Sequence, residues 1–273
     1  MSWFQALVIG IVQGLTEFLP ISSTAHVRLV PEFLGWPDPG AAFTAVIQLG
    51  TLLAVFVYFW KDILRVTKAW ISGMRDVNAR GSDYRLGWAV VYGTIPVVVL
   101  GFLFKDSIGG EFRSLYVIAG ALIGLALLLG LAEKLAKHVR PLDDVTIKDG
   151  WVIGVFQALA LVPGVSRSGS TITGALFLGF DRETAARLSF LLSIPAIFLA
   201  GIFELISERE ALAGLGLMPV LVASIAAFVS GYVSIEFLLR FLRTRSTFVF
   251  IAYRVALGLL LFVLLGQGVL SAT

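Results

Sequence analysis

Residues 8–26 read VIGIVQGLTEFLPISSTAH, and residues 152–171 read VIGVFQALALVPGVSRSGST. Both stretches begin with Val-Ile-Gly, continue as an apolar run and are interrupted by proline before a series of hydroxyl side chains. The same residue recurs 144 positions later at Val8, Ile9, Gly10, Gln13, Leu15 and Ser22, which correspond to Val152, Ile153, Gly154, Gln157, Leu159 and Ser166. Repeated, broken hydrophobic segments of this kind indicate a binding site within a membrane protein.

The composition of the 273-residue chain excludes an ordinary soluble globule. Hydrophobic residues make up 58% of the chain, charged residues 14%, and the mean hydropathy is +0.92, whereas charged residues form about a quarter of a typical soluble protein. Apolar blocks of about 20 residues are long enough to cross a bilayer. They predict six transmembrane helices, at about 41–60, 86–104, 114–133, 184–205, 217–239 and 247–267.

Segments 3–26 and 150–178 are broken by Pro20 and by the Pro163-Gly164 pair, which interrupt helical hydrogen bonding. Irregular backbone is tolerated at membrane depth only where protein or a wet cavity covers it. We therefore predict two re-entrant helical hairpins in an all-α polytopic membrane protein. The chain would form a single membrane domain, 1–273, whose halves, about 1–140 and 141–273, make an inverted-topology internal repeat.

The distribution of Lys and Arg tests this topology, because cytoplasmic loops are enriched in both. If each hairpin returns to its own side, one face holds Lys61, Arg65, Lys68, Arg75, Arg80, Arg85, Lys134, Lys137, Arg140, Lys148, Arg240, Arg243 and Arg245, and the other holds Arg28, Lys105, Arg113 and Arg209. The rich face is then expected inside and both termini outside. The charge count is also compatible with a fully spanning segment 3–26, which would place the N-terminus inside.

The remaining composition limits what the chain can do. The net charge of +3 is explained by topology, so we expect no nucleic-acid partner. The absence of Cys excludes disulfides, thiolate catalysis and Cys-ligated metal centres. No basic residue precedes Arg28, unlike the charged start of a signal peptide, so we expect the apolar N-terminus to remain in the mature protein.

Ionisable side chains inside the apolar segments are a strong functional signal, because a charge at membrane depth is costly unless it is paired or hydrated. Gln13 and Glu17 lie four residues apart on one helix face, so their oxygens could bind a hard cation, Mg²⁺ or Ca²⁺. Arg167 either binds phosphate or forms a structural bridge to Glu17. Glu236 and Arg254, on neighbouring spans, either bridge each other or snorkel toward the cytoplasmic face.

Hydroxyl residues open the second half of each hairpin, where free backbone N–H groups at a helix N-terminus suit an anion. Although a single hydroxyl in a membrane helix is usually bonded to backbone or to a neighbouring helix, their density here favours a phosphate site. Its predicted members are Ser22, Thr24, Ser166, Arg167, Ser168 and Thr171.

The first hairpin also contains a candidate nucleophile. Ser23 and His26 lie three residues apart and share a face of a regular helix, which makes His26 the predicted proton partner of Ser23. Attack by an activated water or by His26 itself are the alternatives. The sequence does not separate these routes.

The motifs QGLTEFLPISSTAH at 13–26 and PGVSRSGST at 163–171 resemble those of the bacterial undecaprenyl pyrophosphate phosphatase family, which is associated with bacitracin resistance. The similarity extends over essentially the whole chain. Members of the family commonly carry Glu or Gln at the first position of the first motif. Gln13 stands there in this chain, so Glu17 alone supplies a carboxylate.

The resemblance implies removal of the terminal phosphate from undecaprenyl pyrophosphate, which recycles the lipid carrier of cell-wall synthesis. Glu17, Ser23, His26 and Arg167 would then be the catalytic residues. The resemblance further implies a divalent metal, a homodimer, and residence in the bacterial plasma (inner) membrane with an active site that opens to the extracytoplasmic side. A lipid flippase or small-solute transporter is the competing interpretation, because carriers also use broken, inverted repeats.

Overall fold

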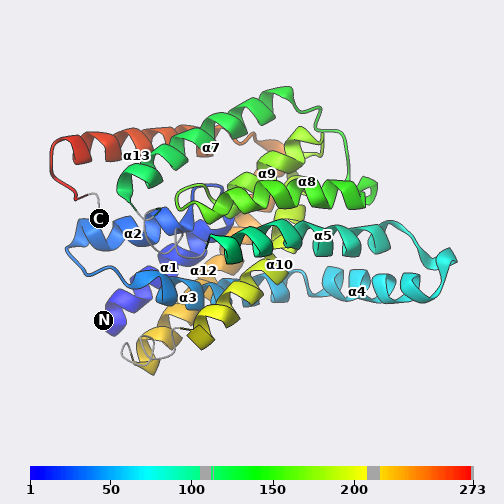
Figure 1. The fold of residues 1–273 in the computed structure, drawn as a ribbon, viewed down its shortest axis with the longest axis horizontal. Coiled ribbons are helices and arrows are strands. Elements are labelled where there is room, and N and C mark those ends of the chain that lie inside the picture. The colour runs from blue at the N-terminus through cyan, green and yellow to red at the C-terminus, as the bar shows by residue number, and fades with distance from the viewer. Residues whose placement is uncertain (105–111, 113, 208–215, 272–273) are drawn as a thin grey trace.

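The computed structural model describes residues 1–104, 112, 114–207 and 216–271, which form a bundle of helices without a β-sheet (Figure 1). The six predicted spans correspond to α3 (Gly40–Tyr58), α5 (Ser82–Leu103), α7 (Leu115–Leu135), α10 (Arg182–Ser207), α12 (Leu217–Thr244) and α13 (Phe248–Gly266). Within the described residues, five of these helices are by themselves long and apolar enough to cross a membrane, and α3 qualifies together with the helix that follows it. The all-α membrane fold predicted from the sequence is confirmed.

The segment after α3 is a helix, although the sequence places residues 61–85 in a loop. α4 (Trp60–Arg75) is bent by 77° from α3. It buries Val66 and exposes Lys61, Arg65 and Lys68, so it is amphipathic. α4 packs on α5, and because its apolar residues form a stripe along one face it produces no long apolar block in the sequence.

Each of the two broken segments forms a helical hairpin. The first consists of α1 (Trp3–Phe18) and α2 (Ser23–Leu34), and the second of α8 (Ile147–Ala158), η4 (Leu159–Leu161) and α9 (Arg167–Phe177). In Figure 1 the first hairpin opens toward the end of the molecule that holds both termini, and the second opens toward the opposite end. The tips of the two hairpins therefore meet in the interior of the bundle.

Both hairpins begin with the same capping arrangement at equivalent repeat positions. Ser2 Oγ accepts a hydrogen bond from the Gln5 backbone N–H, at 3.1 Å, and Gln5 Oε1 accepts one from the Ser2 N–H, at 2.8 Å. Thr146 and Asp149 exchange the same pair of bonds at 3.2 and 2.8 Å. These reciprocal bonds satisfy N–H groups that a helix start leaves open.

The second helix of each hairpin also begins in the same way. Ser22 and Ser166 are the N-caps of α2 and α9, with φ values of 76° and 75°. Ser22 Oγ accepts from the Ala25 N–H at 3.4 Å, and Ser166 Oγ accepts from the Gly169 N–H at 3.1 Å. A positive φ is uncommon outside glycine, so the two turns share a rare conformation.

The hairpins pack on helices that are distant in sequence. α1 packs along α12, and α8 packs along α5. A Cβ atom on Gly10 would lie 2.3 Å from the carbonyl oxygen of Ala223, and one on Gly154 would lie 2.3 Å from that of Gly93. Small residues allow membrane helices to approach this closely. Gly10 and Gly154 are equivalent repeat positions, while the boundary between halves near residue 140 remains a prediction.

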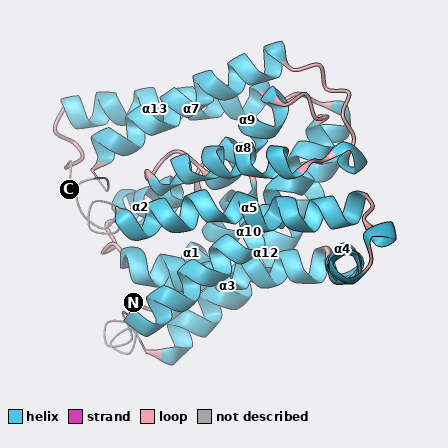
Figure 2. Ribbon diagram, turned by 45° about the vertical axis from the view of Figure 1, so that its right-hand side comes forward, coloured by secondary structure: helices cyan, strands magenta, loops and turns pink. Residues whose placement is uncertain are grey.

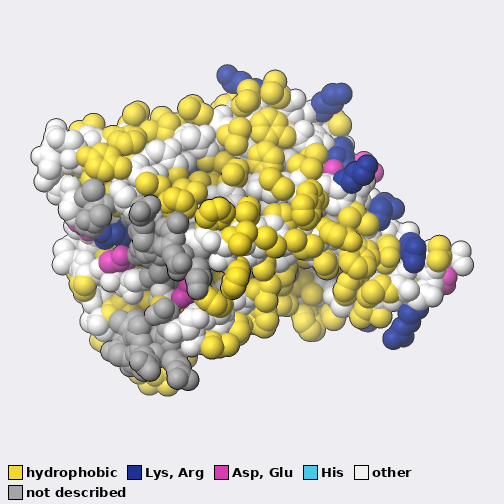
Figure 3. All heavy atoms as spheres, in the orientation of Figure 1, with side chains coloured by type: hydrophobic (Ala, Val, Ile, Leu, Met, Phe, Trp, Pro, Cys, Tyr) yellow, Lys and Arg dark blue, Asp and Glu magenta, His cyan; other side chains and the backbone are white. Residues whose placement is uncertain are grey.

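The surface is divided between apolar and charged regions. Apolar side chains cover the middle of the molecule, and Lys and Arg side chains gather at the end that holds α4 (Figure 3). Of the basic residues predicted at the opposite end, Lys105, Arg113 and Arg209 lie outside the described residues. Arg28 pairs there with Glu32 at 3.0 Å.

Substitution of Gly154 by alanine should destabilise the protein. The added methyl group meets the backbone of α5, which cannot rotate away, and overpacking of this kind costs about 1–3 kcal/mol. Gly120→Ala, on α7, is the control because a Cβ there meets nothing within 4 Å. Thermal unfolding in detergent should show a lower midpoint for Gly154→Ala and an equal or higher one for Gly120→Ala. Equal midpoints in both variants would contradict the tight α5–α8 contact.

Candidate active site

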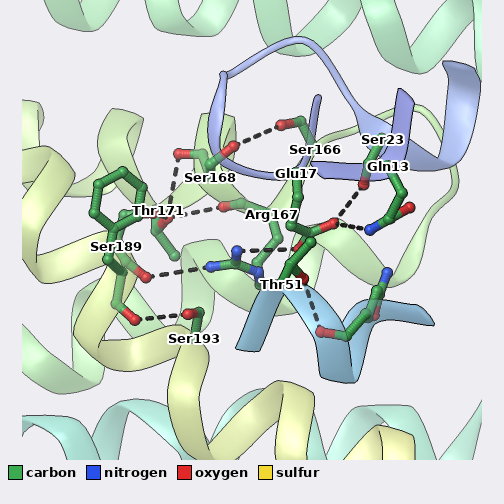
Figure 4. Close-up of polar contacts among 12 residues, drawn as sticks. Gln13, Glu17, Ser23, Thr51, Ser166, Arg167, Ser168, Thr171, Ser189 and Ser193 are labelled. Carbon is green, nitrogen blue, oxygen red and sulfur yellow. Dashed lines mark hydrogen bonds and ion pairs between the residues drawn. The ribbon is translucent and has the colours of Figure 1, made fainter. Parts of the chain in front are cut away.

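Glu17, in the last turn of α1, is the centre of a polar cluster between the two hairpins (Figure 4). Its Oε1 accepts a hydrogen bond from Arg167 Nη2 at 3.1 Å. Its Oε2 accepts from Gln13 Nε2 and from Ser23 Oγ, each at 2.7 Å. The side chains of Glu17 and Arg167 are 3% and 13% exposed, so this is a buried ion pair. The two motifs predicted to converge do so at this pair.

Arg167 also contacts α10. Its Nη1 donates to the backbone oxygen of Ser189 at 3.2 Å, and Thr171 Oγ1 lies 2.7 Å from Ser189 Oγ. Arg167 Nε is buried and donates no hydrogen bond within the described part of the chain. The guanidinium is therefore fixed by two contacts, and its Nε–H is left for another acceptor.

The predicted phosphate-binding hydroxyls have different surroundings. Ser168 Oγ donates to the backbone oxygen of Leu19 at 3.0 Å and so joins the second hairpin to the first. Ser22, Ser166 and Thr171 are buried. Thr24 is exposed, and its hydroxyl lies 3.1 Å from that of Ser22. Ser168 alone among these hydroxyls joins the two hairpins, Ser22 and Ser166 cap their own helices, and Thr24 is the exposed one.

His26 makes no hydrogen bond to Ser23 within the described residues, in contrast to the predicted pairing. Its Nδ1 lies 2.7 Å from the backbone oxygen of Ser22, and its Nε2 lies 2.6 Å from the hydroxyl of Tyr253 on α13. Because a carbonyl oxygen only accepts, Nδ1 carries the proton in this arrangement. The ring is turned back over the start of α2, so the hydrogen-bond partner of Ser23 is Glu17.

Glu236 and Arg254 do not bridge each other, and Arg254 does not snorkel toward a membrane face; both predictions are wrong. Glu236 accepts hydrogen bonds from Tyr58 and Arg240. Arg254 is fully buried and donates to backbone oxygens rather than to a carboxylate. The functional signal of an arginine inside an apolar span was present in the sequence, but the identity of its partners was not.

Ser189, Ser193 and Tyr253 are further residues of the site region that sequence reasoning missed. Ser189 and Ser193 lie four residues apart in the apolar span of α10 and are completely buried. That spacing places both on one helix face and was a readable signal. Nothing in the sequence links Tyr253 to His26, which is 227 residues away.

A cavity of about 700 Å³ reaches the first hairpin at Thr24, but Glu17, Ser23 and Arg167 are not part of its wall. Its charged lining residues are Arg28, Asp38 and Glu204. Thr24 on α2, Gln48 on α3 and Pro163 in the second hairpin turn contribute to its wall. The rest of the wall is largely apolar and comes from α5 and α10, including Val97, Val98, Phe102, Leu199 and Phe203. Because Thr24 follows Ser23 directly, an apolar molecule in this cavity would have one end beside the polar cluster.

The oxygen donors of the cluster fit a hard cation only in part. Gln13 Oε1 is buried and accepts no hydrogen bond from any described residue, while Nε2 of the same amide donates to Glu17 Oε2. No group of three or more His, Cys, Asp or Glu side chains occurs among the described residues. Mg²⁺ commonly binds one or two carboxylates together with substrate phosphates. The donors present therefore fit a cation whose coordination a phosphate ligand completes.

Comparison with known proteins identifies the family. The model of the family described as Bacitracin resistance protein BacA matches residues 6–260. The chain belongs to this family. Among BacA relatives, the undecaprenyl-diphosphatase of Chloroherpeton thalassium is 55% identical over 282 residues, which cover 100% of both chains. That of Myxococcus xanthus is 57% identical over 272 residues, 99% of this chain and 92% of the relative. The predicted family is confirmed.

Removal of both members of the buried ion pair should destabilise the protein by less than the sum of the two single removals. Glu17→Ala leaves the Arg167 charge buried without its partner, which costs about 3–5 kcal/mol. The double variant Glu17→Ala, Arg167→Ala should lose less than the sum of the single variants. A double-mutant cycle of unfolding in detergent measures the difference.

The exposed Glu183–Arg243 pair, at 2.9 Å, is the control, and it should show a much smaller coupling because solvent screens it. Additive effects of Glu17→Ala and Arg167→Ala would contradict a coupled buried pair.

Proposed function

We propose that this chain hydrolyses undecaprenyl diphosphate to undecaprenyl phosphate and inorganic phosphate. Full-length relatives that carry the name undecaprenyl-diphosphatase support this activity. The observation that carries it is the Ser23 hydroxyl, 2.7 Å from the Glu17 carboxylate, beside the Arg167 guanidinium. The proposed nucleophile Ser23, the proposed base Glu17 and the phosphate-binding guanidinium of Arg167 lie together at the tips of the two hairpins.

The cavity accounts for a lipid substrate. An isoprenoid chain is apolar, as is most of the cavity wall formed by α5 and α10. Its diphosphate head would lie at the end near Thr24 and Pro163, next to the cluster. The N-termini of α2 and α9 begin there, and helix N-termini attract anions. Apolar tail and anionic head thus match the two parts of the site.

The first chemical step is phosphoryl transfer to Ser23. Glu17 Oε2 takes the hydroxyl proton as Ser23 Oγ bonds to the terminal phosphorus, and the anhydride bond breaks to release undecaprenyl phosphate. Arg167, with its unused Nε donor, binds phosphate oxygens and balances charge in the transition state. Positioning and countercharge supply most of the catalysis in reactions of this kind.

The second step returns the enzyme to its starting state. Water attacks the phosphoserine, and Glu17 returns to the leaving Ser23 oxygen the proton that it took in the first step. Both protons of the water depart with inorganic phosphate, so Ser23 and the Glu17 carboxylate are restored. Direct attack by water or by His26 remains the alternative, but the Ser23–Glu17 contact and the engagement of His26 with Tyr253 favour Ser23.

A divalent cation, Mg²⁺ or Ca²⁺, forms part of the proposal. Gln13 Oε1 and the Glu17 carboxylate would hold it. When bound, such a cation supplies positive charge to the diphosphate oxygens.

The surface supports a location and an orientation. We place the protein in the bacterial plasma (inner) membrane, with the Lys/Arg-rich end that holds α4 in the cytoplasm (Figure 3). Each hairpin would then return to the side from which it enters, and the active site would open to the extracytoplasmic side. The homodimer implied by the family resemblance remains a prediction.

The comparisons support an enzyme rather than a flippase or transporter, since curated relatives at 50–57% identity over essentially the full chain are named as diphosphatases. Broken helices in an inverted repeat also occur in carriers. The polar cluster, however, contains the parts that a phosphatase needs.

Ser23→Ala should lower phosphate release from undecaprenyl diphosphate roughly a thousandfold or more, because the nucleophile is lost. The assay uses purified protein in detergent, where transport between two sides is impossible. Rapid acid quench of the wild-type protein should trap phosphoserine at position 23, detectable by mass spectrometry. Ser230→Ala, a helical serine outside the site, is the control.

Near-normal turnover of Ser23→Ala would exclude this nucleophile and favour water. A wild-type protein that releases no phosphate would reject the diphosphatase assignment.

Removal of divalent cations by a chelator should lower phosphate release by about tenfold or more, and added Mg²⁺ or Ca²⁺ should restore it. Gln13→Ala should raise the cation concentration needed for half-maximal activity. Gln157→Ala is the matched control, because Gln157 is the equivalent repeat position but Leu161 stands where Glu17 stands in the first copy. Full activity after chelation and dialysis would reject the metal, and equal effects of both Gln variants would reject Gln13 as its ligand.

A further inference from the structure

Arg254, in the middle of α13, is a completely buried charge with an unusual set of partners. α13 lies beside α7 at one edge of the bundle in both views (Figures 1 and 2). Arg254 Nε donates to the backbone oxygen of Leu122 at 3.1 Å, and Nη2 donates to that of Ala121 at 3.2 Å. These two bonds fix the guanidinium against α7.

The other bonds of Arg254 reach both hairpin turns. Nη1 donates to the backbone oxygen of Pro20 at 3.2 Å, and Nη2 donates to that of Gly164 at 3.0 Å. Pro20 and Gly164 are equivalent positions of the repeat, 144 residues apart. One side chain therefore holds the same carbonyl group of both turns.

The chemistry of the site requires these two turns to keep their relative position. Each carbonyl stands two residues before a serine N-cap with positive φ, Ser22 or Ser166. Ser23 and Arg167 come immediately after these caps. A shift of one turn against the other would move the nucleophile away from the guanidinium that binds its phosphate.

The free-energy cost of burying the Arg254 charge also indicates that this residue has a functional role. No ion pair joins it to a carboxylate in ranges 1–104, 114–207 and 216–271, and a buried charge without such a partner is expensive. A planar guanidinium donates along several directions at once, whereas a lysine ammonium acts as a point charge on a flexible stem. Only the planar fork suits four carbonyl oxygens from three parts of the chain.

We propose that Arg254 is a positioning residue that locks the two hairpin turns together and thereby aligns Ser23 with Arg167. It touches neither the substrate nor the reacting atoms. The predicted effect of Arg254 on turnover rests on the diphosphatase function proposed above. Its predicted effect on the positions of the two turns is independent of that function.

The first test is hydrogen exchange measured by mass spectrometry on the detergent-purified protein. Arg254→Met removes the charge and keeps the volume of the stem, and Arg254→Lys keeps the charge without the fork. In both variants the backbone amides of segments 19–24 and 162–168 should exchange about tenfold faster, with no change along α12. Arg240→Met, an exposed arginine on α12, is the control.

Faster exchange at only one turn, or at neither, overturns the proposal. If Arg254→Met does not fold, the experiment rests on Arg254→Lys alone. Hydrogen exchange at the wild-type rate in both turns of that variant would also overturn the proposal.

The second test separates positioning from simple stabilisation. For folded Arg254→Lys or Arg254→Met, kcat for phosphate release should fall about tenfold to a hundredfold, because misplaced reacting groups lose rate. KM should change less than about threefold, since the cavity wall is intact. If exchange at the two turns is faster but kcat is unchanged, Arg254 has a purely structural role and the proposal that it positions the reacting groups is rejected. If the wild-type protein releases no phosphate, the diphosphatase function fails, and the exchange experiment still decides whether Arg254 joins the turns.

Discussion

The ion pair between Glu17 and Arg167 is the interaction on which the arrangement of the site depends. It forms between the tip of one hairpin and the tip of the other, from residues 150 positions apart. Loss of either charge would leave the other buried without its ionic partner, which is strongly destabilising. The pair therefore requires both hairpins to be in place. The same carboxylate receives Ser23 and Gln13, so structural pairing and proposed chemistry share one group.

The sequence was sufficient for the fold because membrane insertion leaves few solutions. Apolar blocks of span length predicted the six long helices, and prolines predicted the two breaks. The amphipathic helix α4 was missed because its apolar residues form a stripe rather than a block. Length and hydropathy reveal uniformly apolar segments, whereas an amphipathic helix requires a periodicity argument.

The sequence predicted which residues belong to the site better than it predicted which residues they contact. Polar residues within apolar segments are costly and therefore indicate a function. This signal identified Gln13, Glu17, Ser23 and Arg167. The hydrogen-bond partner of His26, Tyr253, was not found from the sequence. That contact depends on the position of α13 beside α2, which no local sequence pattern encodes. The bonds of Arg254 were hidden for a similar reason. Its acceptors are backbone oxygens, which carry no sequence signature.

The packing of α1 on α12 has a consequence for how the chain is made. α1 is translated long before α12, yet its glycines fit against that helix, which begins at residue 217. Until that partner is synthesised and inserted, the N-terminal hairpin, with its broken backbone and buried carboxylate, lacks the protein surface that should cover it. Biogenesis must therefore hold this segment near the insertion machinery, or at the membrane interface, while most of the protein is translated.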